Sequence, residues 1–208
     1  MARLMSDSMT IRCATTNQGK LREFRLAGAA AGFEVETLDG LREIPAPEET
    51  GHTFEENAVQ KALYYGARTP DWFFTDDSGL EVDALDGAPG VHSARYAGED
   101  ATDADNNNLL LERLRGCEDR GAQFVCAIAL ARAGRLVKTF RGVVRGRIIG
   151  RPRGSGGFGY DPLFFHEPFG CTFGEADLKE KMQVSHRAQA LRQMFSWLRD
   201  NASTSGIR

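Results

Sequence analysis

Apolar residues fall into short runs and amphipathic stretches along this chain, and the two patterns indicate alternating strands and helices. Thr10–Thr15 and Trp72–Thr75 are apolar runs of strand length, and Phe33–Leu38 alternates apolar with acidic residues as a half-buried strand does. Lys20–Ala31 and Ser185–Arg199 repeat apolar residues at helical spacing, so each is expected to bury one face. The pattern predicts an α/β protein.

Two longer strand-like stretches in the second half of the chain predict a hairpin beside those elements. Gln123–Ala131 and Leu136–Gly150 are separated by the pair Ala133-Gly134, which suits a tight turn. Long paired strands of this kind favour a mixed sheet over a purely parallel one. We therefore expect a long mixed β-sheet with flanking helices.

Length and composition predict one folded unit. The chain has 208 residues, of which 41% are hydrophobic, and this is enough for one sizeable core. No convincing linker interrupts residues 10–199, which we expect to form a single domain. Residues 1–9 are expected to be a disordered N-terminal extension, and residues 200–208 a polar C-terminal tail.

Charge and cysteine usage narrow the choice of partner and compartment. A net charge of −3 and an isoelectric point near 5.9 argue against nucleic-acid and membrane-surface partners, which usually require a basic excess. No run approaches the roughly 20 apolar residues of a membrane span, and no signal peptide is recognisable at the start. The four cysteines form no CxxC pair, so a reducing, cytoplasmic location is expected.

The first chemical signal is the segment Phe74–Leu80, where an apolar run is followed by Asp76, Asp77 and a Ser78-Gly79 pair. We expect the strand to end here, either for good or with a continuation in Leu80–Leu85 past the Ser-Gly turn, and to deliver a carboxylate to the mouth of a cleft. Neighbouring strand residues point to opposite faces, so only one of the two aspartates can face a given site. Two solvated carboxylates in an ordinary turn are the alternative.

The second signal is Thr15–Lys20, a strand-to-helix turn rich in hydroxyl and amide groups. Helix N-termini offer free N–H donors and partial positive charge, and Lys20 adds a full charge, so the segment suits an anion. A plain polar N-cap is the alternative. The segment is not a Walker loop, because Ala14 stands where glycine is required and Leu21 follows the lysine.

Aromatic and basic residues supply a third signal near the C-terminus. Phe158 and Tyr160 alternate with glycines, which suits a platform for stacking a ring. The formal GxGxxG pattern at 154–159 is not a dinucleotide site, because Pro162 and the apolar residues after it predict extended chain rather than a helix. Ser185 resembles an N-cap, which places His186 and Arg187 in a first helical turn that disfavours basic residues and hints at a further role.

Acidic and amide residues around residue 50 are further candidates. Thr53 and Glu56 form a capping-box pattern that predicts a helix to about residue 67. Asn57 and Lys61 share one face of that helix and either look into the cleft or form a solvated face. The adjacent glutamates 48 and 49 precede it, and Arg95 lies in the glycine-rich segment 87–98, which we expect to be a surface loop.

Taken in order, these segments resemble one family, the inosine/xanthosine triphosphate pyrophosphatases. The resemblance implies two lobes around a nucleotide-binding cleft, Mg²⁺ as cofactor, a homodimer, and hydrolysis of noncanonical purine nucleoside triphosphates (ITP, dITP, XTP) to monophosphate and pyrophosphate. That activity would keep such nucleotides out of DNA and RNA. The segments are Thr15–Lys20, Phe54–Ala58, Asp76–Leu80, Gly87–Tyr96, Gly157–Pro162 and Ser185–Arg187.

The resemblance also assigns roles to residues. Asp77 would be the catalytic base and a metal ligand, and Glu48 the second metal ligand, with Glu49 leaving the register open by one residue. His186 and Arg187 would contact the base, where paired donors favour a 6-oxo purine over a 6-amino one. The substrate-binding set would be Thr15, Thr16, Asn17, Gln18, Gly19, Lys20, Ser78, Phe158, Gly159, Tyr160, Asp161, Lys181, His186 and Arg187.

Two other functions stay open on the sequence. One is a related pyrophosphatase that clears another base, such as the septum-formation-inhibitor-like group; the Ser185–Arg187 segment and Phe158 count against it. The other is a nucleotide sensor without turnover, against which Asp77 and Glu48 argue. A single assay of pyrophosphate release decides about the sensor, and the same assay over a panel of nucleotides, with and without Mg²⁺, decides about the related pyrophosphatase.

Overall fold

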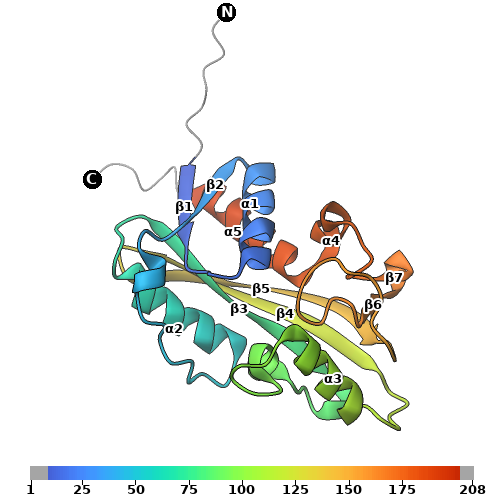
Figure 1. Cartoon of the computed structure of the whole chain (residues 1–208). Helices are drawn as coiled ribbons and strands as arrows, with labels where there is room; N and C mark the ends of the chain where they lie inside the picture. Colours follow the sequence, from blue (N-terminus) through green and yellow to red (C-terminus); the bar gives the residue numbers. More distant parts are fainter. Residues whose placement is uncertain (1–8, 202–208) are drawn as a thin grey trace, which may run out of the picture.

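A seven-stranded sheet in the order β2-β1-β3-β4-β5-β6-β7 forms the centre of the protein (Figure 1). The computed structural model describes residues 9–201, so all but the last residue of the predicted extension and most of the predicted tail lie outside the described residues. The strands are β1 Met9–Cys13, β2 Phe33–Thr37, β3 Trp72–Val82, β4 Gly121–Arg132, β5 Arg135–Ile148, β6 Phe164–His166 and β7 Cys171–Thr172. The α-helices are α1 Gln18–Ala31, α2 Phe54–Gly66, α3 Asp103–Arg113, α4 Leu178–Val184 and α5 His186–Asn201.

The sheet is mixed, as the strand pattern predicts. β1 runs parallel to β2 and β3, whereas β3, β4, β5, β6 and β7 pair antiparallel in turn. The predicted hairpin joins β4 to β5 through Ala133 and Gly134, both at positive φ (48° and 72°), as a tight hairpin turn requires. The single mixed-sheet α/β domain is thus confirmed, while the division into two lobes stays an expectation.

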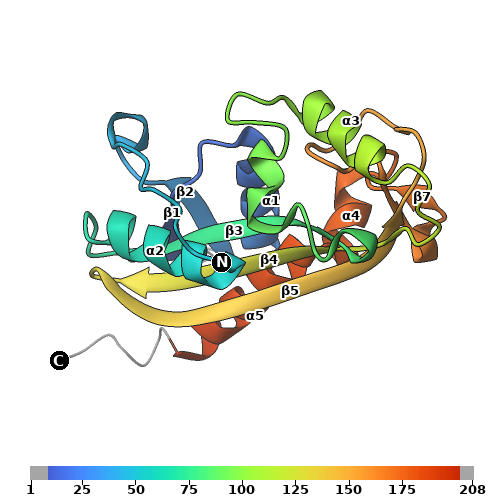
Figure 2. The ribbon, with the colours of Figure 1, turned by 90° about the horizontal axis from the view of Figure 1, so that it is seen from below.

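Helices cover both faces of the sheet (Figures 1 and 2). α1 and α5 pack on one face, where Phe24 and Phe195 join a cluster around Ile11 and Ile128. α2 lies on the other face and buries Phe54, Ala58 and Ala62 against the alanine-rich middle of β4. None of the helices within residues 9–201 is long and apolar enough to cross a membrane.

β3 differs from its prediction in a way that creates the site. The chain does not turn at Ser78-Gly79; β3 continues to Val82 and pairs with β4 along its whole length. Gly79 is not part of a turn; it allows the Ser93 side chain to approach the β3 backbone closely, because a Cβ at this position would overlap the Ser93 hydroxyl. On its other edge β3 meets β1 only at Phe73 and Phe74, so the residues that follow have no strand beside them there.

The segment that fills the space beside β3 is more ordered than predicted. Residues 90–95 form a 3₁₀ helix instead of a loose surface loop. Its Ser93 is buried, accepts a hydrogen bond from Leu80 N (2.9 Å) and donates one to Gly90 O (2.6 Å). The prediction of a surface loop is therefore wrong for this part, because a hydroxyl here replaces the missing strand as a partner of β3.

Candidate active site

A pocket of about 200 Å³ lies where β3 passes the end of β1. It is enclosed by the start of α1, the middle of β3, α2, the 3₁₀ helix and the first turn of α5. Most of the predicted site residues line it: Asn17, Lys20, Asp77, Ser78, Phe158, Gly159, Tyr160, Asp161, Lys181, His186 and Arg187. The structure therefore brings together side chains that lie up to 170 positions apart in the sequence.

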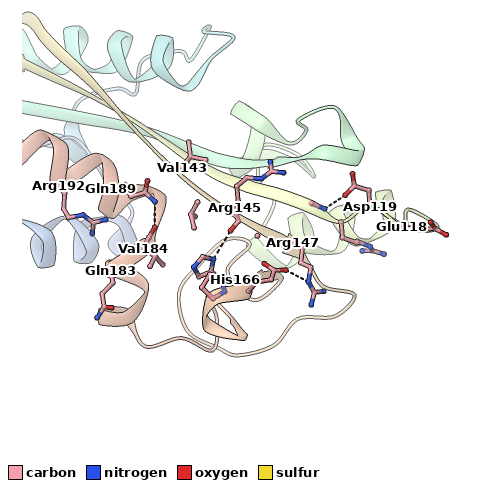
Figure 3. A pocket seen from close by; sticks show the side chains of 16 residues that line it. Glu118, Asp119, Val143, Arg145, Arg147, His166, Gln183, Val184, Gln189 and Arg192 are labelled. Atoms are coloured by element: carbon pink, nitrogen blue, oxygen red, sulfur yellow. Dashed lines mark hydrogen bonds and ion pairs between the residues drawn. The ribbon is translucent and has the colours of Figure 1, made fainter.

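A larger but shallow groove of about 1050 Å³ lies elsewhere, between β5, β6 and the α4–α5 junction (Figure 3). Two of its polar contacts are internal to the protein: Arg147 binds Glu167 at 2.8 Å, and His166 Nδ1 lies 3.3 Å from Arg145 O. None of the predicted site residues lines this groove. Its size therefore does not make it the chemical site.

Asp77, in the middle of β3, lines the pocket. Its carboxylate lies 2.9 Å from Lys61 Nζ and accepts a hydrogen bond of 3.3 Å from Asn57 Nδ2. Both partners come from α2, so the predicted shared face of that helix does look into the cleft. Burial raises the pKa of Asp77 above its ordinary value of 3.8, and the Lys61 charge opposes this shift only in part. A carboxylate with a raised pKa is a better proton acceptor.

Asp76 points to the opposite face of β3, as the strand period predicts. It lies 3.0 Å from Lys20 Nζ and accepts a hydrogen bond of 2.6 Å from Ser78 Oγ. Arg187 Nε is 3.6 Å away. These charges hold the pKa of Asp76 far below its ordinary value despite burial. The alternative of two solvated turn carboxylates is wrong, because both aspartates are buried and paired.

The second acidic residue at the pocket is Glu49 and not the predicted Glu48, its neighbour in the sequence. Glu48 is exposed and does not line the pocket, whereas Glu49 does. The Glu49 carboxylate accepts from Lys61 Nζ at 2.8 Å and from Arg95 at 3.4 Å, and these charges lower its pKa although burial opposes them. The sequence could not show which of the two adjacent glutamates faces the pocket, because an irregular segment has no helical or strand period that assigns a face to each residue.

The donor set around Asp77 fits Mg²⁺. The carboxylates of Asp77 and Glu49 already converge on one cationic atom, Lys61 Nζ. Magnesium in proteins takes one or two carboxylates and fills its other positions with water and phosphate oxygens. Residues 9–201 contain no group of three or more His, Cys, Asp and Glu side chains placed to hold a metal.

The Thr15–Lys20 turn is only partly in the pocket. Asn17 caps α1 by accepting a hydrogen bond from Lys20 N at 3.0 Å, so the capping alternative is correct for this residue. Of the six predicted residues, Asn17 and Lys20 line the pocket, and the others do not. Gly19 is needed for packing, since a Cβ there would lie 2.5 Å from the Phe158 ring. The residues outside the pocket are Thr15, Thr16, Gln18 and Gly19.

A buried ion network closes the far end of the pocket. Glu23 of α1 receives Lys181 Nζ at 2.9 Å and also binds Arg187 through Nη1. Lys181 reaches Asp161 at 2.7 Å as well. All four side chains are at most 3% exposed. Because each charge faces an opposite charge, this end of the pocket is rigid before any ligand arrives.

Rings lie beside this network. The His186 imidazole stacks on Phe124 with centroids 4.8 Å apart, and burial holds its pKa well below 6.5, so it is neutral. Lys181 and Arg187 lie 5.1 and 5.4 Å from the Phe158 ring centroid. The pairing of Phe158 with Tyr160 as one platform is corrected: Tyr160 is buried in the core and its hydroxyl donates to Ser93 O at 2.8 Å.

Two nitrogens at this end have no hydrogen-bond partner among the described residues. They are His186 Nδ1 and Arg187 Nε; both are buried, and Arg187 Nε has only the longer ion pair of 3.6 Å with Asp76. Buried polar atoms in native proteins almost always have a partner, so unpaired ones need an explanation. Both belong to side chains that line the pocket, where a bound ring with polar edge atoms can supply that partner.

Comparison with known proteins identifies the family and supports the fold. The sequence model of the Ham1 family matches residues 11–197, nearly the whole described chain. This chain belongs to the Ham1 family. The match spans every side chain described above, from Lys20 to Arg187.

Individual relatives match over most of the chain. The dITP/XTP pyrophosphatase of Acidobacterium capsulatum is 47% identical over 92% of this chain and 98% of its own, and that of Gloeobacter violaceus is 50% identical over 88% and 91%. The structure of a HAM1 protein from Coxiella burnetii is 39% identical, covers 92% of this chain and 99% of its own, and superposes with a TM-score of 0.82.

Sequence reasoning missed Glu23 and Phe124 in this Ham1-family site. Glu23 lies on the buried side of α1, four residues before Ala27, so a carboxylate at an apolar position of an amphipathic helix was the available signal. Phe124 gave none, since an aromatic residue in a buried strand is usually core. α4, which carries Lys181, was also not predicted, because seven residues are too few for a clear period.

Proposed function

We propose that this chain hydrolyses noncanonical purine nucleoside triphosphates, dITP, ITP and XTP, to the monophosphate and pyrophosphate, and so keeps them out of DNA and RNA. The observation that carries the proposal is the presence of Asp77, His186 and Arg187 in one pocket. The activity named for the Acidobacterium capsulatum and Gloeobacter violaceus relatives supports it.

The proposed mechanism divides the work between the two ends of the pocket. Asp77 accepts a proton from the attacking water, and Lys61, at 2.9 Å, orients its carboxylate. Lys20 and the N-terminus of α1 offset the charge of the polyphosphate. Mg²⁺, held by Asp77 and Glu49, would neutralise phosphate charge and polarise the phosphoryl oxygens.

Base selection follows from the unpaired nitrogens at the buried end. Arg187 has only donors, and a purine with an oxygen at C6 offers an acceptor to them. An adenine ring presents an amino group instead and leaves a buried donor unpaired, which polar sites reject strongly. This reasoning excludes ATP; guanine carries the same 6-oxo group and is not excluded by it.

A panel of nucleotides tests the activity directly. Pyrophosphate and monophosphate are expected in equal amounts from dITP, ITP and XTP, with ATP far slower. Release of inorganic phosphate instead of pyrophosphate, or equal rates for all purines, would overturn the proposal.

Two neighbouring glutamates, Glu49 and Glu48, provide a test variant and its control for the metal dependence of the activity. Chelator is expected to abolish activity and Mg²⁺ to restore it. Glu49→Gln is expected to raise the Mg²⁺ concentration for half-maximal rate about tenfold or more, whereas the adjacent, exposed Glu48→Gln leaves it unchanged. Full activity in chelator would remove Mg²⁺ from the mechanism. A raised Mg²⁺ requirement in Glu48→Gln but not in Glu49→Gln would mean that Glu48, and not Glu49, is the metal ligand.

We further propose a homodimer in the cytoplasm, without nucleic-acid or membrane partners. The four cysteines are all free thiols, of which Cys13 and Cys126 are buried, and this supports a reducing compartment. Light scattering after size exclusion tests the oligomeric state: a mass near 46 kDa, about twice that of the 22.9 kDa chain, is expected, and a mass near 23 kDa at working concentration contradicts it.

A further inference from the structure

Arg95 is held over the Asp77 end of the pocket by an unusually well-anchored backbone. The peptide groups on both sides of it are tied to three different parts of the fold. The hydrogen bonds are Ser93 Oγ with Leu80 N (2.9 Å), Tyr160 Oη to Ser93 O (2.8 Å), Asn106 Nδ2 to Ala94 O (3.1 Å) and Ala97 N to Asn106 Oδ1 (2.8 Å). The Cα of Arg95 is therefore fixed relative to β3.

The side chain of Arg95 is, by contrast, loosely held. Its Nη1 lies 3.4 Å from Glu49 and its Nε 3.5 Å from Glu99, which is itself 85% exposed. Both contacts are longer than the usual 2.7–2.9 Å of charge-assisted hydrogen bonds. A guanidinium has five N–H donors in a planar fork. Arg95 thus lines the pocket with most of its donors uncommitted to short bonds within residues 9–201.

The charged side chains around Arg95 form a row that leads away from the buried network of Glu23, Lys181, Asp161 and Arg187. The part of the pocket at that network, where the nucleobase is proposed to bind, is called the base end. Asp77 binds Lys61, Lys61 binds Glu49, and Glu49 binds Arg95. Phe158 and the buried network line the same pocket from other elements, namely α1, α4, α5 and the segment 158–161. A nucleotide whose ring lies at Phe158 would then place its outer phosphates along this row.

We propose that Arg95 binds the outer two phosphates of the substrate, which leave as pyrophosphate. The inference rests on the proposed function, since it takes the cleaved bond to lie between the first and second phosphates. The planar fork of Arg95 matches phosphate oxygens in a bidentate way that an ammonium does not. Arg95 exchanges its long contact with Glu49 for these oxygens.

Product binding tests this inference without turnover. Calorimetric titration of the full chain with pyrophosphate, with and without Mg²⁺, is compared with titration by inosine monophosphate. Arg95→Ala is expected to weaken pyrophosphate binding by about 10- to 100-fold, the usual effect of losing hydrogen bonds to a charged group, with inosine monophosphate affinity unchanged. Arg95→Lys should recover only part of the loss. Arg145→Ala, an exposed arginine paired with Asp83 outside this pocket, is the control and should change neither affinity.

A double-mutant cycle separates direct contact from an effect through Glu49. If Arg95 touches pyrophosphate, Arg95→Ala still weakens its binding in a Glu49→Gln background. If the loss disappears in that background, Arg95 only positions Glu49 and the inference is overturned. Equal pyrophosphate affinity of wild type and Arg95→Ala also overturns it. The proposed function fails separately, if wild type releases no pyrophosphate from dITP or XTP while Arg95 still governs pyrophosphate binding.

Discussion

The two ends of the pocket are built in opposite ways. At the base end, Glu23, Lys181, Asp161 and Arg187 are buried, and the ion pairs through Lys181 are 2.7 and 2.9 Å long. The end with Asp77, Glu49 and Arg95 is the proposed phosphate end. There the side chains of Glu49 and Arg95 are about a quarter exposed, and their mutual contact is 3.4 Å. The charged network at one end is saturated with short, buried ion pairs and leaves only His186 Nδ1 and Arg187 Nε without a hydrogen-bond partner within residues 9–201. The contact between Glu49 and Arg95 at the other end is longer and partly exposed.

This difference indicates a division of labour. A rigid, water-free set of polar groups discriminates between ligands, because it cannot adjust to one that leaves a group unpaired. Charges at a more open end can instead rearrange around a polyphosphate and its metal. Under the proposed function, the buried network selects the nucleobase, and the more exposed charges take part in the chemistry.

The largest expected effect is at the phosphate end. Asp77→Asn keeps the shape of the side chain but removes the proton acceptor and one metal ligand. Turnover of dITP is expected to fall by about 10²–10⁴-fold, the usual contribution of a general base, with the far-ultraviolet circular dichroism unchanged. Asp76→Asn is the comparison: a similar loss of turnover in both variants, at equal stability, would contradict the separate roles of the two aspartates.

At the base end the expected effect is on stability. Glu23→Gln leaves Lys181 and Arg187 without the carboxylate that they share, and breaking a buried ion network typically costs about 3–5 kcal/mol. Urea unfolding measures the change in free energy, and Glu34→Gln on the exposed side of β2 serves as the control, within about 0.5 kcal/mol of wild type. A loss no larger than that of the control would show that the network is not saturated as described.

Phe158→Leu should give a smaller and unselective effect. Stacking depends little on which base is present, so affinities for dITP, XTP and dATP are expected to fall together by about 1–3 kcal/mol. Inhibition constants of the corresponding monophosphates measure this. A change confined to one base would mean that Phe158 reads the edge of the ring rather than its face.

The smallest expected effect concerns pH and His186. Its pKa is held well below 6.5 by burial and by Arg187, so below pH 6.5 the unfolded chain binds a proton here that the folded chain does not. The free energy of unfolding therefore falls as pH falls below 6.5. In His186→Gln the difference in this free energy between pH 7.5 and 5.5, measured by urea unfolding, should be smaller than in wild type, and in the exposed His52→Gln it should not. An unchanged difference in His186→Gln would contradict a neutral, buried imidazole.

The sequence predicted the elements and most of the site, and its errors share a physical cause. Periodicity located the hairpin and the amphipathic helices, and the acids and glycines marked the pocket. It could not show that β3 continues through Asp76 and Asp77, since that depends on Ser93 approaching Gly79 from another segment. It missed Glu23 for the same reason, because its partners lie 158 and 164 positions away. Contacts distant in sequence were the unpredictable part.

The division of labour is tested most directly by binding without turnover. The Asp77→Asn variant, which cannot accept the proton, is titrated calorimetrically with dITP and with dATP in the presence of Mg²⁺. The account predicts that dITP still binds and that dATP is rejected by about a hundredfold or more, because the base end is untouched. Equal affinity for the two nucleotides would contradict it, since selection would then depend on the end that carries out the chemistry.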